Sequence, residues 1–192
     1  MVRYLLIGLM TLTISTPLWS QKQASVWYFG HHAGLDFRSG EPVALTDGAL
    51  NTNEGSASIC DEAGNLLFYT DGVTVWNREH HVMPNGRNLW GHSTTTQTLI
   101  VPKPGVDPIY YIFTASPQHD YVFGAGTDSV GFHYTVVDMR MASGLGDVTV
   151  KNILLFRNTT EKVTAVHHAN GMDIWVVAHE WGNNIFRSLS GH

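Results

Sequence analysis

The sequence predicts an all-β fold, and three features support that prediction. Hydrophobic residues make up 43% of the 192-residue chain, charged residues only 14%, and glycine occurs 19 times. Short β-branched and aromatic runs recur and are separated by Asp-Gly, Asn-Gly and Pro-Gly turn signals. After residue 20 no segment long enough for a helix has apolar residues at helical spacing without an interrupting Gly, Pro, Asn or Asp. The composition therefore fits short strands joined by tight turns.

The first 20 residues have the pattern of a secretory signal peptide. Arg3 supplies a positive charge, residues 4–14 (YLLIGLMTLTI) are apolar, and residues 15–20 are polar and end in Ser20. The apolar run is shorter than the roughly 20 residues that span a bilayer. We therefore expect cleavage after Ser20 and secretion, or display at the cell surface, of a domain at residues 21–192. No transmembrane segment is expected after the signal peptide.

The strands expected beyond the signal peptide are short and rich in β-branched or aromatic residues. The expected runs are residues 26–29, 66–70, 73–76, 98–101, 109–114, 130–137, 148–155, 162–167 and 174–178, with a further strand-like segment at 183–190. Only residues 136–142 (VVDMRMA) allow a single helical turn.

A weak internal repeat groups these runs into hairpins. Each unit is an apolar strand, a polar turn and an aromatic-rich strand, as in SASIC-DEAGN-LLFYT, TLIVP-KPGVDP-IYYIFTA and VTAVHH-ANGMD-IWVVAHE. The second strands begin at Leu66, Ile109 and Ile174. The first spacing, roughly 43 residues, is near the blade period of a β-propeller, and the second, roughly 65, indicates an insertion of about half a unit between Ser116 and Thr160. The sequence thus predicts a partial β-propeller of about three to four blades, incomplete at its C-terminal end. The alternative is a two-sheet β-sandwich.

Several longer strings resemble a known family. They include WYFG-x-x-AGLDF (27–37), PVALTDGALNTNEGSASI (42–59), DEAGNLLFYTDGVTVWN (61–77), MPNG (83–86), YYIFT (110–114) and VVDM…GLGDVTVKN (136–152). Together they resemble the N-terminal region of large secreted Bacteroidota proteins. Those proteins carry β-sandwich repeats further on and end in a gliding-motility-associated sorting domain of the type IX secretion system. The resemblance implies a WD40-like or lactonase-like propeller that is the front part of a longer product, and it carries over no catalytic residue.

The metal-binding patterns in the sequence are weak. Eleven histidines include three adjacent pairs, but neighbours on a strand point to opposite faces and rarely ligate one ion. His179-Glu180 begins like a zincin motif, yet Asn183 stands where the second histidine is needed. The turn that begins at Asp61 suits a bulged turn better than a calcium loop. We therefore expect no metal site, and we expect the single cysteine, Cys60, to be a small buried hydrophobe.

Catalytic patterns are similarly sparse. The sequence has no G-x-S-x-G elbow, no phosphate-binding loop and no dinucleotide fingerprint, so we expect no catalytic residue and no cofactor. Glu54, Asp61 and Asp71 are the acids from which a glycosidase pair could be drawn, and they would support that activity only if they lined one pocket.

Aromatic residues are the remaining candidates for binding. Trp76, Trp90 and Trp181 lie near expected turns beside polar neighbours, where an aromatic ring can stack on a sugar or anchor a partner. The aromatics inside strand runs are expected to pack in the core or between blades; they are Trp27, Tyr28, Phe29, Tyr69, Tyr111, Phe113 and Trp175.

The leading functional hypothesis is a non-catalytic surface module whose loops bind a glycan or an envelope or matrix protein, in adhesion or gliding. A net charge of −5 and scattered Lys and Arg exclude a nucleic-acid footprint. The alternatives are a secreted hydrolase acting on polysaccharide and a structural fragment without independent function.

Overall fold

The computed structural model describes residues 22–92, 98–117 and 130–191, and the predicted signal peptide lies outside these ranges. In the described residues the regular structure is β-strands and two short 3-10 helices, so the all-β prediction is confirmed. The strands are β1 (Val26–Phe29), β2 (Ala33–Asp36), β3 (Val43–Leu45), β4 (Ala57–Cys60), β5 (Leu66–Thr70), β6 (Val75–Asn77), β7 (Thr98–Pro102), β8 (Ile109–Ala115), β9 (Phe132–Asp138), β10 (Asp147–Phe156), β11 (Thr159–His167), β12 (Ile174–Glu180) and β13 (Phe186–Gly191). The helices are η1 (Lys22–Ala24) and η2 (Ala142–Gly144).

Every run expected to be a strand overlaps a strand of the structure, whereas β2 and β3 were not expected. β2 has the sequence AGLD, with one branched residue, and β3 is only three residues long, so neither carries a strong strand signal. Pairing with β1 and with each other holds them in the sheet. The helical turn allowed at 136–142 does not form there, because β9 continues to Asp138 and pairs with β10.

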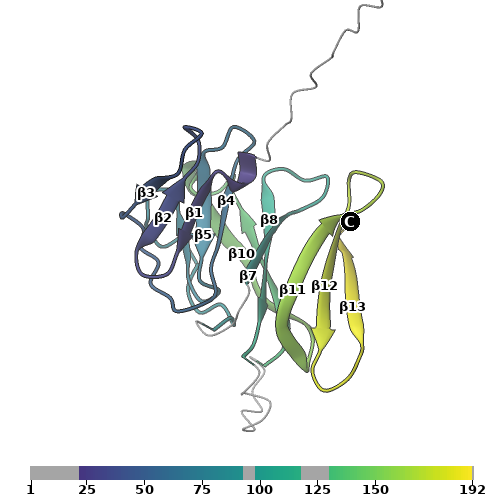
Figure 1. Cartoon of the computed structure of the whole chain (residues 1–192). Helices are drawn as coiled ribbons and strands as arrows, with labels where there is room; N and C mark the ends of the chain where they lie inside the picture. Colours follow the sequence, from purple (N-terminus) through teal and green to yellow (C-terminus); the bar gives the residue numbers. More distant parts are fainter. Residues whose placement is uncertain (1–21, 93–97, 118–129, 192) are drawn as a thin grey trace, which may run out of the picture.

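Four antiparallel sheets follow one another along the chain, each built from consecutive strands (Figure 1). Their strand orders are β1-β2-β3, β4-β5-β6, β7-β8-β9-β10 and β11-β12-β13, and we call them the first to the fourth sheet. The three repeated hairpins of the sequence are β4-β5, β7-β8 and β11-β12, each in antiparallel register. None of the described sheets closes on itself.

Neighbouring sheets meet through their first strands. β1 contacts β4, β4 contacts β7, and β11 contacts β7 and β8. Three hydrophobic clusters fill the successive spaces. Tyr28 and Tyr69 lie in the cluster between the first two sheets, Phe68 and Ile112 between the second and third, and Phe113 and Val176 between the third and fourth.

Among the described residues no helix has both the length and the apolar character needed to cross a membrane.

Candidate functional site

Trp76, one of the three tryptophans predicted to bind a ligand, is part of the core. It lies in β6 directly opposite Tyr69 of β5, and the two rings stack with centroids 5.6 Å apart and planes 16° apart. Only 9% of Trp76 is exposed. The sequence places this residue near a turn, but strand pairing turns its ring into the space between the first two sheets. The expectation that Trp76 offers a free ring is therefore wrong.

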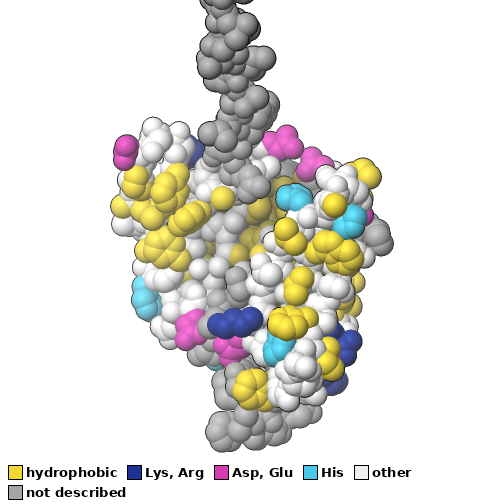
Figure 2. All heavy atoms as spheres, turned by 45° about the vertical axis from the view of Figure 1, so that its right-hand side comes forward, with side chains coloured by type: hydrophobic (Ala, Val, Ile, Leu, Met, Phe, Trp, Pro, Cys, Tyr) yellow, Lys and Arg dark blue, Asp and Glu magenta, His cyan; other side chains and the backbone are white. Residues whose placement is uncertain are grey.

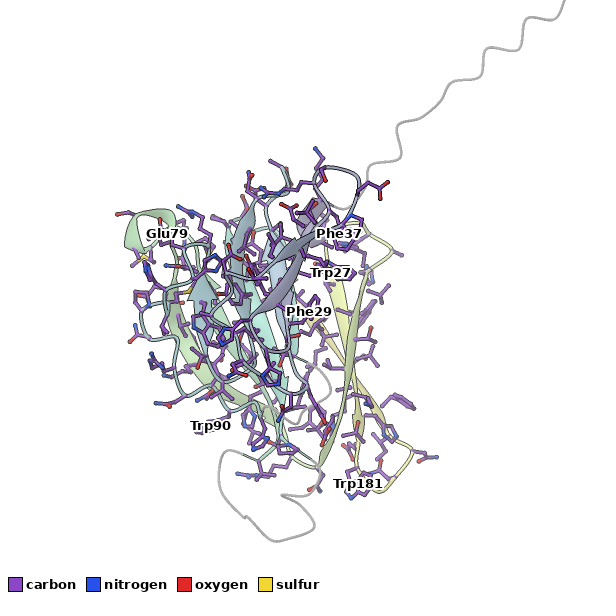
Figure 3. The ribbon with its side chains drawn as sticks, turned by 60° about the vertical axis from the view of Figure 1, so that its left-hand side comes forward. Trp27, Phe29, Phe37, Glu79, Trp90 and Trp181 are labelled. Carbon is purple, nitrogen blue, oxygen red and sulfur yellow. The ribbon has the colours of Figure 1, made fainter. Side chains whose placement is uncertain are left out.

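Trp90 and Trp181 lie on different parts of the molecule (Figure 3). Trp90 is half-buried between β6 and β7, where its ring meets His133 edge-to-face at 5.1 Å and its backbone N–H donates to Asn152 Oδ1. Trp181 begins the β12–β13 turn and is 41% exposed, close in sequence to the exposed Ile185. The structure does not bring the three tryptophans into one site, and only Trp181 presents an open ring.

A larger exposed aromatic surface lies on the first sheet. Residues of β1 alternate between buried and exposed, so Val26 and Tyr28 face the core while Trp27 and Phe29 face outward, 47% and 38% exposed. Leu35 of β2 is paired directly opposite Trp27 and therefore shares its face. Sequence reasoning assigned Trp27 and Phe29 to packing, and for both residues the structure contradicts that assignment.

Phe37, just beyond β2, completes this surface. Its ring lies 4.9 Å from that of Trp27, at an interplanar angle of 58°, and the indole N–H of Trp27 donates to Ala24 O over 2.8 Å. We call Trp27, Phe29, Leu35 and Phe37 the aromatic face. Figure 3 shows its three aromatic residues together on the same side of the first sheet, and hydrophobic side chains gather over that sheet in Figure 2.

The sequence VWYF shows an alternation of side chains, but it does not show which side of the strand is covered by another sheet. The second sheet covers β1 through β4, which lies about 30 residues further along the chain, and the hydrogen bond from Tyr28 N–H to Ser58 Oγ joins the two strands.

A hydrogen-bonded polar cluster joins the first two sheets. Tyr28 OH donates to Asp47 Oδ1 over 2.8 Å, Asp47 Oδ2 lies 3.5 Å from His80 Nε2, and His80 Nδ1 lies 3.0 Å from Tyr69 OH. Tyr69 OH also accepts the backbone N–H of Ala49 over 2.9 Å. Burial, and then the bond to Asp47, raises the pKa of Tyr28.

The four side chains of this cluster form one series of contacts, from Tyr28 of the first sheet through Asp47 and His80 to Tyr69 of the second. The cluster therefore links the first sheet to the second.

The three acids considered for hydrolysis do not converge. Asp61 lies in the β4–β5 turn and Asp71 in the β5–β6 turn, so β5 separates them, while Glu54 is exposed in the β3–β4 connection. Asp71 Oδ1 accepts the backbone N–H groups of Val73 and Thr74. Burial alone would raise the pKa of Asp61, but hydrogen bonds from Asn65 and its neighbours hold it below its usual value. Both aspartates therefore shape turns.

Histidines and the cysteine form no cation site in the parts of the chain that the structure describes, where no group of three or more His, Cys, Asp or Glu could hold a metal ion. His179 and Glu180 point to opposite faces of β12: the His179 ring lies 4.6 Å from Phe186, whereas Glu180 pairs with Arg187. Cys60 is fully buried, as expected, and burial raises the pKa of its thiol, which keeps it unreactive.

A scan against protein-family models, a search of curated proteins and a search of solved structures each found no match.

Proposed function

We propose that the chain is an exported, non-catalytic binding module whose four sheets are consecutive blades of an open β-propeller. The strand orders and the contacts between successive first strands support this arrangement. A β-sandwich has a single core between two sheets, whereas here three clusters alternate with four sheets. The signal-peptide pattern supports export, and a surface or extracellular location follows from it.

The observation that carries the binding function is the aromatic face. Large exposed aromatic side chains on a rigid sheet mark interaction surfaces, because covering them removes apolar area from water at little cost in side-chain entropy. Trp27 and Phe29 are held by β1, and the Trp27 indole is further fixed by its bond to Ala24. The surface is therefore preorganised for a partner.

The chemistry of the aromatic face favours an envelope or matrix protein over a glycan. A sugar needs hydrogen-bonding groups beside a stacking ring, but Phe29, Leu35 and Phe37 offer none from their side chains. The one indole N–H on the face, that of Trp27, already donates to Ala24. An apolar protein surface fits such a face directly.

Binding to envelope material tests this function. The full chain, purified after export, is immobilised and exposed to solubilised envelope proteins and, separately, to the polysaccharides of the producing cell. We expect Trp27→Ala/Phe29→Ala to weaken retention of a saturable protein partner by about tenfold or more. Met172→Ala, at a position 70% exposed in the β11–β12 turn, is the matched control and should retain the partner fully.

Equal retention by the double variant and the Met172→Ala control would contradict a role for the aromatic face. Saturable binding to polysaccharide alone would assign the module to a glycan instead. A turnover of polysaccharide by the chain would overturn the non-catalytic assignment.

A further inference from the structure

An apolar cavity of about 190 Å³, partly open to solvent, lies between the third and fourth sheets. Its lining from the third sheet includes Tyr111, Phe113 and Tyr134, and its lining from the fourth includes Val176, Leu189 and Ser190. The cavity is at the edge of the cluster that joins these two sheets: Phe113 and Val176 are buried in that cluster, whereas Tyr111, Tyr134 and Leu189 are only partly buried against it. It lies away from the aromatic face, which belongs to the first sheet.

Water in this cavity finds few hydrogen-bond partners, because most of the lining is apolar. A cavity of about 150 Å³ with apolar walls is large enough to bind benzene, so this one has room for a single ring with a small substituent.

Three aromatic rings on neighbouring strands give the cavity a preference among apolar ligands. Tyr111 of β8 and Tyr134 of β9 meet edge-to-face at 5.6 Å and 85°, and Phe113 lies 6.0 Å from Tyr111 at 46°. Rings in these orientations present both faces and edges to the cavity. Because an aromatic ring has a negative face and a positive edge, these rings attract another aromatic ring more strongly than an aliphatic one.

We propose that this cavity is a binding site for a small monocyclic aromatic compound. The inference is independent of the aromatic face and of what that face binds. The site is preformed, since its walls belong to two sheets whose strands are paired throughout the lining segments.

Toluene is the probe, added to the full chain and followed by calorimetry and by thermal unfolding. Bound toluene stabilises only the folded state, so we expect the melting temperature to rise by about 3–6 °C at tenfold excess over the dissociation constant. Cyclohexane, of similar size, should bind more weakly.

Two neighbours on β12 give a matched pair of variants. Val176 lines the cavity, whereas Val177 points to the opposite face of the same strand. We expect Val176→Phe to fill part of the cavity and weaken toluene binding by about tenfold or more, and Val177→Phe to leave it unchanged. If Val176→Phe does not fold, Leu189→Phe tests the same wall from β13.

Binding of toluene that neither filling variant reduces, or the absence of any toluene-induced rise in melting temperature, would overturn the proposal. If cyclohexane bound as tightly as toluene, the proposed preference of the cavity for an aromatic ring would be wrong. Retention of the envelope partner should be the same in Val176→Phe as in the unchanged chain, so a failure here is separable from a failure of the proposed function.

Discussion

At the scale of single residues, the same short motif stabilises the ends of two strands. Asp36 at the end of β2 accepts the backbone N–H of Arg38 and also its guanidinium, and Asp138 at the end of β9 bonds Arg140 in the same way. These bonds hold the pKa of both carboxyls below their usual values. Asn183 and Arg187 do the same for the pKa of Glu180.

These three carboxyls predict how stability depends on pH. Their pKa values are lower in the folded than in the unfolded state, so the unfolded chain takes up protons first as the solution is acidified. Their contribution to the free energy of unfolding is complete above the ordinary carboxyl pKa of about 4 and is lost as pH falls through the folded values. We expect the urea midpoint to be lower at pH 3 than at pH 6.

The matched control for the pH dependence is Asp36→Asn/Asp138→Asn, which keeps the shape of both side chains and removes their titration. It should show a smaller fall in urea midpoint between pH 6 and pH 3 than the unchanged chain. The same fall in both proteins would show that these motifs do not set the acid response.

At the scale of elements, Tyr69 connects two sheets through one hydroxyl. It lies in β5 of the second sheet, is fully buried, and accepts the N–H of Ala49, which follows β3 of the first sheet. Its ring stacks on Tyr28 of β1 at 4.6 Å. The hydroxyl thus fixes the chain that leaves the first sheet, while the ring fills the space between the two sheets.

Tyr69→Phe keeps the ring and removes that hydroxyl. The Ala49 N–H and His80 Nδ1 both lose their partner, and a polar group left without one near a core costs about 1–3 kcal/mol. Chemical unfolding should show a loss in this range. Tyr28→Phe is the comparison: its hydroxyl bonds Asp47, whose side chain is 60% exposed and can turn to water, so the loss should be smaller. Equal losses would contradict the assigned role of Tyr69.

The sequence predicted the elements with strong local signals and missed those held by their neighbours. The runs at β1 and β5 were predicted to the residue because aromatic and β-branched residues fill them. β2 and β3 were missed because partners in the sheet, not composition, define them. Trp76 and Trp27 were placed on the wrong sides for a related reason: a side chain's exposure depends on which sheet covers its face, and local pattern does not contain that information.

At the scale of the whole molecule, the four sheets form a series in which each contacts its neighbours in the chain. The second and third sheets have a hydrophobic cluster on both sides, whereas the first and fourth have one on a single side. The outward sides of the terminal sheets remain apolar, with Trp27 47% exposed on the first, and Val166 59% and Phe186 69% exposed on the fourth. The hairpin repeat in the sequence marked the second, third and fourth of these sheets, but not the first sheet or which faces would stay open.

Such a series predicts graded stability along the chain. Where units contact only their neighbours, stability is a sum of unit and interface contributions, so a unit with one interface opens more readily than a unit with two. The strands β2, β5, β8 and β12 make a fair comparison, because each has a paired strand on both sides. Differences among their amides therefore report the packing of whole sheets and not the edge of a sheet.

Native-state hydrogen exchange measures this gradient. Amides of β5 and β8 should exchange more slowly than those of β2 and β12 by about tenfold or more, since tenfold corresponds to only about 1.4 kcal/mol of opening free energy. Adding the envelope partner that binds the aromatic face should slow β2 selectively, because it supplies the missing cover, and leave β12 unchanged. Equal protection of all four strands would mean that the sheets unfold as one unit, in which case the open faces at the two ends do not limit the stability of the molecule.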